Sequence, residues 1–164
     1  LPTVTTDKLG TGAVLQVVQD FKTDTVVGTS NSYTGTGLSA TITPSSTSSK
    51  ILVMFTVNCT INNGTWMLRL ARGSTVIGVG DSSGSRVQST VGGFHPTADT
   101  NHQSNPTSAQ YLDSPNTTSA ITYVVQYKAQ TGTTFYMNRA SADADNGNWS
   151  HRSTSSITLM EIAG

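Results

Sequence analysis

Apolar and polar residues alternate at a spacing of two along most of this chain, which is the pattern of β-strands. The two most apolar stretches are 50–57 and 156–162, and both are apolar on both faces. Because successive side chains of a strand point to opposite sides, the last stretch has two distinct faces. One carries Ile157, Leu159 and Glu161, and the other Thr158, Met160 and Ile162. We therefore expect the two stretches to be neighbouring central strands with protein on each side.

Shorter alternating stretches predict additional strands. They lie at 13–21, 25–30, 38–43, 65–72, 75–79, 109–112, 121–127 and 133–139. Asn62-Asn63-Gly64 is typical of a type I′ hairpin turn, since Asn-Gly accepts positive φ at both central positions. No segment of ten residues has the apolar spacing of an amphipathic helix. The fold class predicted is all-β, as a jelly-roll-like β-sandwich of about ten strands.

The 164 residues suit a single domain preceded by a short polar segment. Residues 1–12 contain Pro2, Gly10 and Gly12 and no alternating pattern, so they are interpreted as a linker or stalk exit. Residues 13–164 form the predicted β-sandwich head domain.

Composition narrows the possible classes of function. Ser and Thr make up 49 of the 164 residues, charged residues only 11%, and the net charge is zero. A nucleic-acid-binding protein would carry a basic patch, and a membrane span needs about 18 consecutive apolar residues. We therefore expect neither nucleic-acid binding nor membrane insertion, and the hydroxyl-rich surface favours an extracellular or virion-surface location. The single cysteine, Cys59, lies in an apolar run and is interpreted as a small core residue.

Candidate catalytic and metal-binding patterns are sparse. The Gly-x-Ser-x-Gly pattern of serine hydrolases occurs once, at 80–84 (GDSSG), but in a polar stretch that is not followed by the helix that this motif requires. His95, His102 and His151 also lie in polar stretches. The sequence therefore predicts a protein that is not an enzyme and has no cofactor. Asp143 and Asp145 are candidate calcium ligands, but their loop departs from the EF-hand spacing, so a turn built by Asp, Asn and Gly is favoured.

Two long polar loops are predicted, at 80–108, with some pairing around 86–90, and at 140–153. Aromatic and polar side chains on loops of a rigid scaffold are typical of ligand-binding sites, including sugar sites. The candidate receptor-binding residues are Phe94, His95, His102, Trp149, His151 and Arg152. The alternative for Trp149 is that its ring folds back and plugs its own loop.

Several segments, taken in order, resemble a known group of proteins. They are 12–19 (GAVLQVVQ), 49–53 (SKILV), 68–73 (LRLARG), 111–115 (YLDSP), 123–127 (YVVQY), 138–139 (NR) and 156–162 (SITLMEI). This series resembles the C-terminal domains of tail-fibre and related structural proteins of tailed bacteriophages, particularly marine and cyanobacterial phages. The resemblance covers nearly the whole chain from about residue 12, although the stretch 80–108 does not match.

The resemblance implies a homotrimeric head, similar in architecture to tumour-necrosis-factor or C1q-like heads. Such a head would form the tip of a tail fibre on the virion and bind a host-surface glycan or protein. The last strand would then lie near a three-fold axis. Candidate interface residues are Ile157, Leu159, Met160 and Ile162, with the face that lines the axis left open. We expect Glu161 to pair with a Lys or Arg, or to lie at the rim of that interface.

Two other functions are compatible with the sequence. One is a structural role without a receptor, as a head fibre, capsid decoration or tail adaptor bound to the remainder of the fibre or virion. The other is a carbohydrate-cleaving enzyme, which ranks last because such enzymes use paired carboxylates and the chain has only nine acidic residues.

Overall fold

The computed structural model describes residues 9–96 and 103–164, and in this part of the chain every regular element is a strand. No helix that could cross a membrane occurs among these residues. The strands are β1 (Val14–Lys22), β2 (Val26–Gly28), β3 (Thr34–Ile42), β4 (Lys50–Ile61), β5 (Gly64–Arg72), β6 (Thr75–Ile77), β7 (Val91–His95), β8 (Asn105–Asp113), β9 (Ile121–Ala129), β10 (Phe135–Met137) and β11 (Ser155–Ile162). The predicted fold class is confirmed.

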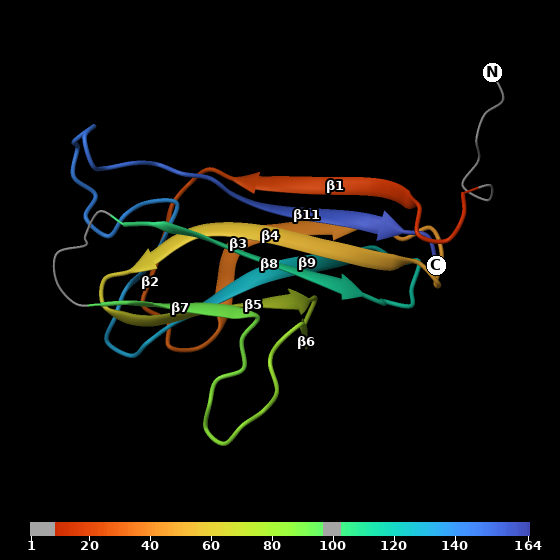
Figure 1. Cartoon of the computed structure of the whole chain (residues 1–164), viewed down its shortest axis with the longest axis horizontal. Helices are drawn as coiled ribbons and strands as arrows, with labels where there is room; N and C mark the ends of the chain where they lie inside the picture. The colour runs from red at the N-terminus through yellow and green to blue at the C-terminus, as the bar shows by residue number, and fades with distance from the viewer. Residues whose placement is uncertain (1–8, 97–102) are drawn as a thin grey trace.

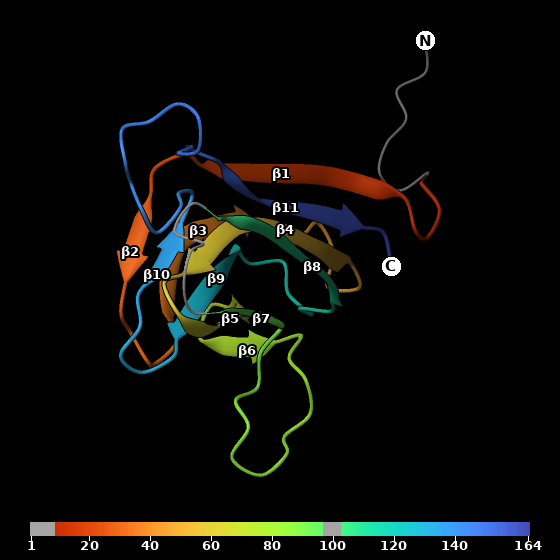
Figure 2. The ribbon, with the colours of Figure 1, turned by 60° about the vertical axis from the view of Figure 1, so that its left-hand side comes forward.

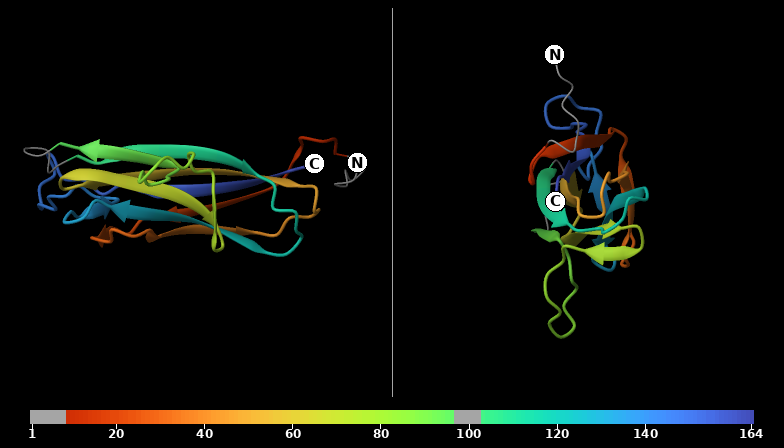
Figure 3. Two further views of the ribbon diagram at one scale, coloured as in Figure 1. Left: turned by 90° about the horizontal axis from the view of Figure 1, so that it is seen from below. Right: turned by 90° about the vertical axis from the view of Figure 1, so that its right-hand side faces the viewer.

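The strands form two antiparallel sheets that pack face to face as an elongated sandwich (Figures 1 and 3). Sheet A contains β1, β11, β4, β10 and β2, with β8 paired to the free side of β4. Sheet B contains β3, β9, β5 and β6, with β7 paired to β5. Each sheet therefore covers the apolar face of the other, as in other β-sandwiches.

Strand β4 is the central strand of sheet A. It pairs with β11 over Lys50 to Thr56 and with β10 over Cys59 to Ile61. Strand β8 pairs with it over Ile51 to Cys59 and therefore occupies the opposite side. A strand has only two edges, so β10 and β11 lie end to end along one edge of β4. The two stretches that are apolar on both faces, β4 and β11, are neighbours as predicted.

The core lies between the sheets and follows the alternation in the sequence. In β4 the odd-numbered residues from Ile51 to Ile61 are buried, and in β5 the buried positions include Trp66, Leu68 and Leu70. Tyr127 stacks on Phe135 with ring centroids 4.4 Å apart. The Tyr127 hydroxyl also occupies the space where a Cβ on Gly28 would stand, only 1.7 Å from that position, so glycine is required there.

The predicted hairpin at Asn62-Asn63-Gly64 is wrong. The segment joins β4 of sheet A to β5 of sheet B, so it crosses between the sheets instead of pairing neighbouring strands. Among its three residues only Gly64 has positive φ, at 88°, whereas a type I′ turn needs two such residues. Both flanking strands have an apolar face that must be buried, and placing them in opposite layers buries both faces.

Strand β7 was not predicted, because glycine is unfavourable in a strand and β7 contains Gly92 and Gly93. The structure explains the glycine at position 93. A Cβ there would lie 2.5 Å from Cζ2 of Trp66, whose ring covers the backbone of Gly93. The glycine that makes this segment look unlike a strand in the sequence therefore leaves room for the Trp66 ring.

The C-terminal end of the chain and the first strand are joined at one end of the sandwich. The Gly12 amide donates to the Ala163 carbonyl at 2.8 Å, and the Ala163 amide donates to the Ala13 carbonyl at 2.8 Å. The start of β1 and the C-terminus therefore lie side by side (Figure 1).

Glu161 lies beside this junction and is fully buried. Its carboxylate accepts hydrogen bonds from the Ser45 amide at 2.7 Å, the Ser45 hydroxyl at 2.6 Å and Nε2 of Gln16 at 2.5 Å. The prediction that Glu161 pairs with a Lys or Arg is therefore wrong. Burial alone would raise the pKa of Glu161, but the hydrogen bonds from Ser45 and Gln16 outweigh it and hold the pKa below its ordinary value.

Candidate functional site

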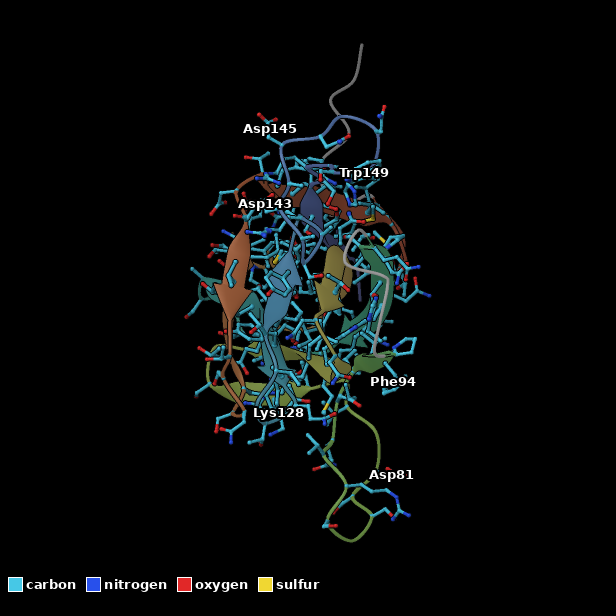
Figure 4. All side chains as sticks on the ribbon, turned by 90° about the vertical axis from the view of Figure 1, so that its left-hand side faces the viewer. Asp81, Phe94, Lys128, Asp143, Asp145 and Trp149 are labelled. Atoms are coloured by element: carbon cyan, nitrogen blue, oxygen red, sulfur yellow. The ribbon has the colours of Figure 1, made fainter. Side chains whose placement is uncertain are left out.

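The loop between Arg139 and Arg152, here called the distal loop, lies at the end of the sandwich opposite the joined start and C-terminus (Figures 1 and 4). Its two ends are held together by an antiparallel bridge between Arg139 and Arg152. The Ser153 amide also donates to the Asn138 carbonyl at 3.1 Å. The loop is thus closed at its base by backbone pairing.

Asn138 fixes this base to the sheet. It is fully buried and has a positive φ of 61°, a conformation that asparagine tolerates better than most residues. Its Nδ2 donates to the carbonyls of Lys22 and Asp24 at 2.8 and 2.9 Å, and its Oδ1 accepts from the Ser155 hydroxyl at 2.6 Å. One side chain therefore connects the end of β1, the start of β11 and the distal loop.

Asp143 is held between two arginines inside the loop. Nη2 of Arg152 donates to its carboxylate at 2.9 Å, and Nη1 of Arg152 binds the other oxygen. Nη1 of Arg139 lies 3.1 Å from Asp143. The hydrogen bonds from Arg152, together with the charge of Arg139, hold the pKa of Asp143 below its ordinary value. The carboxylate therefore stays ionised and fixes the loop from within.

The distal loop encloses a polar concavity. It is lined by Asp143, Ala144, Asp145, Asn146, Gly147, Ser150, His151 and Arg152. Within the loop the Asn148 amide donates to Oδ1 of Asn146, and the Ser150 amide donates to the Asn146 carbonyl, both at 2.9 Å. Oγ of Ser150 is buried, and no hydrogen-bond partner for it lies in the described part of the chain. These contacts shape a small surface of carboxylate and amide groups.

Trp149 adds an apolar surface to the loop, with 52% of its side chain exposed. A ring that plugged the loop would be buried, so the plug alternative is wrong. The predicted residues His151 and Arg152 are also exposed, and both line the concavity. Two of the six predicted binding residues therefore meet at the concavity, and Trp149 lies in the same loop outside its lining. The Arg152 guanidinium is engaged by Asp143.

The other predicted residues lie elsewhere. Phe94 is 69% exposed on β7, and Figure 4 shows it on the opposite side of this end of the molecule from Trp149. His95 is buried on β7 opposite Gly64, so it has no surface to offer a receptor. His102 lies outside the described residues. The predicted set therefore does not form one site.

The calcium interpretation of Asp143 and Asp145 is not supported by the geometry. Both carboxylate oxygens of Asp143 are bound by guanidinium groups, which a cation would have to displace. No group of three or more His, Cys, Asp or Glu side chains in the described ranges could hold a metal ion. The turn interpretation of this segment is the better one.

Sequence reasoning missed the roles of Asn138 and Arg139. A signal for Arg139 exists in its spacing of four residues from Asp143, but such a spacing is informative only on a helix. Asn138 acts through Lys22, Asp24 and Ser155, which lie more than a dozen residues away along the chain. Only the assembled sheet reveals those partners.

A second exposed segment is the arm, residues 78–90, which projects from sheet B between β6 and β7 (Figures 2 and 4). Every residue from Gly80 to Gln88 is exposed. The arm is closed at its base by a hydrogen bond of 3.2 Å from the Gly80 amide to the Ser89 carbonyl. At the same place the Tyr33 hydroxyl donates to the Gln88 carbonyl at 2.8 Å. The expected pairing near 86–90 consists of this closure and of one backbone hydrogen bond of 2.9 Å from the Thr90 amide to the Leu68 carbonyl of β5.

The predicted interface residues of β11 separate onto two faces. Ile157 and Leu159 are fully buried in the core of a single chain, so they have no surface to offer another subunit and that part of the prediction is wrong. Met160 and Ile162 point to the outer face of sheet A and are half-buried. Only the second pair remains available for an interface.

Met160 belongs to an apolar row across the outer face of sheet A. The register aligns Val17 of β1 with Met160, Met160 with Leu52 of β4, and Leu52 with Leu112 of β8. Val17 and Leu112, at the ends of the row, are 55% and 49% exposed. Four apolar side chains in register on an outer face are unusual for the surface of an isolated sandwich.

Comparison of the chain with protein-family models and with curated proteins gave no match to either.

Proposed function

We propose that this chain is a non-enzymatic, virion-surface binding head, the tip of a phage tail fibre, which attaches to a host-surface receptor through its distal loop. One observation carries the proposal. The start of β1 and the C-terminus are hydrogen-bonded together at one end of the elongated sandwich, and the distal loop lies at the other (Figure 1). A head attached to a fibre by the first end would present the distal loop outward.

The chemistry of the distal loop favours a glycan as the receptor. An exposed tryptophan offers a flat apolar surface for the C–H groups of a sugar ring, and Asp145 and Asn146 offer hydrogen-bonding groups for its hydroxyls. The guanidinium groups of Arg139 and Arg152 are both engaged by Asp143. We call these three residues the clamp. Because neither of its arginines is left for a ligand carboxylate, a neutral sugar fits better than an acidic one.

The proposal includes a homotrimer whose subunits meet through the outer face of sheet A. The row Val17, Met160, Leu52 and Leu112 supports it, since burying half-exposed apolar side chains against another copy is favourable by about 25 cal/mol per Å². Light scattering of the purified chain should give a mass that is a whole multiple of three monomers. A Met160→Lys variant should lower that mass, whereas Phe94→Lys on sheet B should not.

The receptor-binding part is tested by probing an array of neutral and acidic bacterial surface glycans with the labelled chain. We expect binding to neutral glycans that Trp149→Ala weakens by about 3- to 10-fold, the scale of a lost aromatic contact. Phe94→Ala, which removes a more exposed ring outside the distal loop, is the matched control. Retained binding in Trp149→Ala would exclude the distal loop.

A structural protein without a receptor is the second candidate. The exposed apolar row favours it, because such a surface is also what a capsid or fibre contact would cover. The two functions are distinguished by measuring the assembly and the adsorption of virus particles. Trp149→Ala particles should assemble normally and adsorb poorly if the chain is a receptor-binding tip, and the reverse result would favour the structural role.

A further inference from the structure

Strand β8 is the outer edge of sheet A, and its free side is open. The only strand paired with it in the described residues is β4 (Figure 2). An open strand edge presents unpaired backbone N–H and C=O groups that can pair with another chain. Which residues of β8 carry these groups follows from the geometry of β4.

Asn58 of β4 sets the direction of the ladder. Its amide donates to Oγ of Ser155, and its carbonyl accepts from the Asn138 amide, so both backbone groups point away from β8. In an antiparallel pair the groups of successive residues point alternately to one partner and the other. Asn58 is aligned with Pro106 of β8, so the backbone of Pro106 faces outward from the sheet.

The register continues without a shift, so the outward-facing positions of β8 are Pro106, Ser108, Gln110 and Leu112. Proline at the first of them agrees with this assignment, since it has no amide to give to a ladder. No hydrogen bond within the described chain reaches the backbone of Ser108, Gln110 or Leu112. Three donors and three acceptors are therefore open in a row.

The opposite edge of the sheet is protected in the usual ways. Strand β1 carries the charges of Asp20 and Lys22, has an irregular register between Val14 and Gln16, and packs against β3 of the other sheet. Charges and bulges are the devices by which natural proteins prevent edge pairing. From 105 to 112, β8 carries no charge, and its one proline stands near the start, so six residues lack any such protection.

We propose that the open edge of β8 pairs with β8 of a second copy, antiparallel across a two-fold axis centred on Gln110. In this register Gln110 faces its own copy and Ser108 faces Leu112 of the partner subunit. All six open groups are then paired, and the missing amide of Pro106 falls outside the paired segment. Self-pairing opposes identical edges, and a strand without charges does so with no electrostatic penalty.

This contact is made by the backbone at the edge of sheet A, whereas the row assigned to the trimer consists of side chains on the outer face. Leu112 takes part in both, through its backbone in the first and its side chain in the second. Its test therefore does not depend on that assembly. Gln110→Cys should give a covalent dimer with a short bis-maleimide, whose two ends each add one cysteine thiol, because the two cysteines would face each other across the axis. Cys59 is buried in the core and should not react.

Two controls check position and register. Ser108→Cys should give little dimer, because the two copies of residue 108 would be offset by four residues, about 13 Å along the strands. Thr75→Cys, on an exposed end of β6 in the other sheet, should give none. Absence of dimer from Gln110→Cys, or equal yields from all three positions, would overturn the proposal.

The backbone origin of the contact is tested with Gln110→Pro. Proline removes an amide that faces the open edge and leaves the ladder to β4 intact. Two hydrogen bonds per pair are lost, so the dimer dissociation constant measured by sedimentation should rise about 10- to 100-fold. Gln110→Ala keeps the amide and should remain close to the native value. Equal effects of the two substitutions would show that the side chain, not the edge, makes the contact.

Discussion

Two carboxylates at opposite ends of the sandwich are held in opposite ways. Glu161 is fully buried and accepts hydrogen bonds from uncharged groups, the amide and hydroxyl of Ser45 and the side-chain amide of Gln16. Asp143 lies in the exposed distal loop and is bound by two arginines. Both have a pKa below the ordinary value, but for different reasons.

The two carboxylates have different roles: the contacts of Glu161 stabilise the fold, and those of Asp143 fix the shape of the distal loop. If a buried carboxylate loses its hydrogen-bond donors, or the donors lose the carboxylate, the remaining groups are desolvated without a partner. The free energy of unfolding then falls. Ion pairs in solvent contribute little to stability. In a chain with only nine Lys and Arg residues, two of them on one exposed carboxylate are better explained by a need to fix the distal loop than by a need to stabilise the sandwich.

The largest effect is expected from Glu161→Ala. The substitution leaves the Ser45 amide and the Gln16 side-chain amide without their acceptor at a part-buried position and opens a small cavity where the Glu161 side chain was buried. The free energy of unfolding at neutral pH should fall by about 2–4 kcal/mol, measured by urea denaturation. Asp143→Ala is the comparison, and its unfolding midpoint should stay close to native. Similar losses of unfolding free energy in both variants would contradict the proposed difference between Glu161 and Asp143.

The pH dependence of stability should also follow Glu161. Its folded pKa lies below the ordinary value of 4.5, so its stabilising contribution is complete above that pH. The contribution is lost as pH falls through the folded pKa, because the unfolded chain binds the proton first. Stability should therefore decline below about pH 4.5. Glu161→Gln should make the decline in the free energy of unfolding at acid pH less steep. An unchanged decline would show that other carboxyl groups cause it.

The arrangement of β4 and β11 could be predicted from the sequence, because a strand that is apolar on both faces needs protein on both sides. Which face of β11 is buried could not. The acid among Ile157 and Leu159 indicated the rim, whereas that face is the core. The reason is that Glu161 is satisfied by Ser45, which lies 116 residues away along the chain and leaves no local signal.

The candidate site shows the same limit. Trp149, His151 and Arg152 could be grouped because they are neighbours in one loop. Phe94 could not be placed, since β7 pairs with β5 and turns it away from that loop. Whether two distant loops converge depends on strand order, which the alternating pattern does not encode.

The smallest effect on stability, and the one most informative about function, is expected from Asp143→Asn. Asparagine keeps the size of the side chain but removes the charge that holds Arg139 and Arg152. The unfolding midpoint should change little, and the small difference should disappear at about 1 M salt, where the Debye length is near 3 Å. The distal loop, however, should lose its fixed shape.

Asp24→Asn is the matched control, because it breaks an exposed ion pair with Lys22 outside the distal loop. Both variants should unfold alike, yet only Asp143→Asn should lose binding on the glycan array. If the two bind alike, the clamp is an ordinary surface ion pair and the site lies elsewhere. If Asp143→Asn instead gains binding to acidic glycans, the released guanidinium groups have become available. That outcome would show that Asp143 sets the preference for neutral sugars by keeping both arginines occupied.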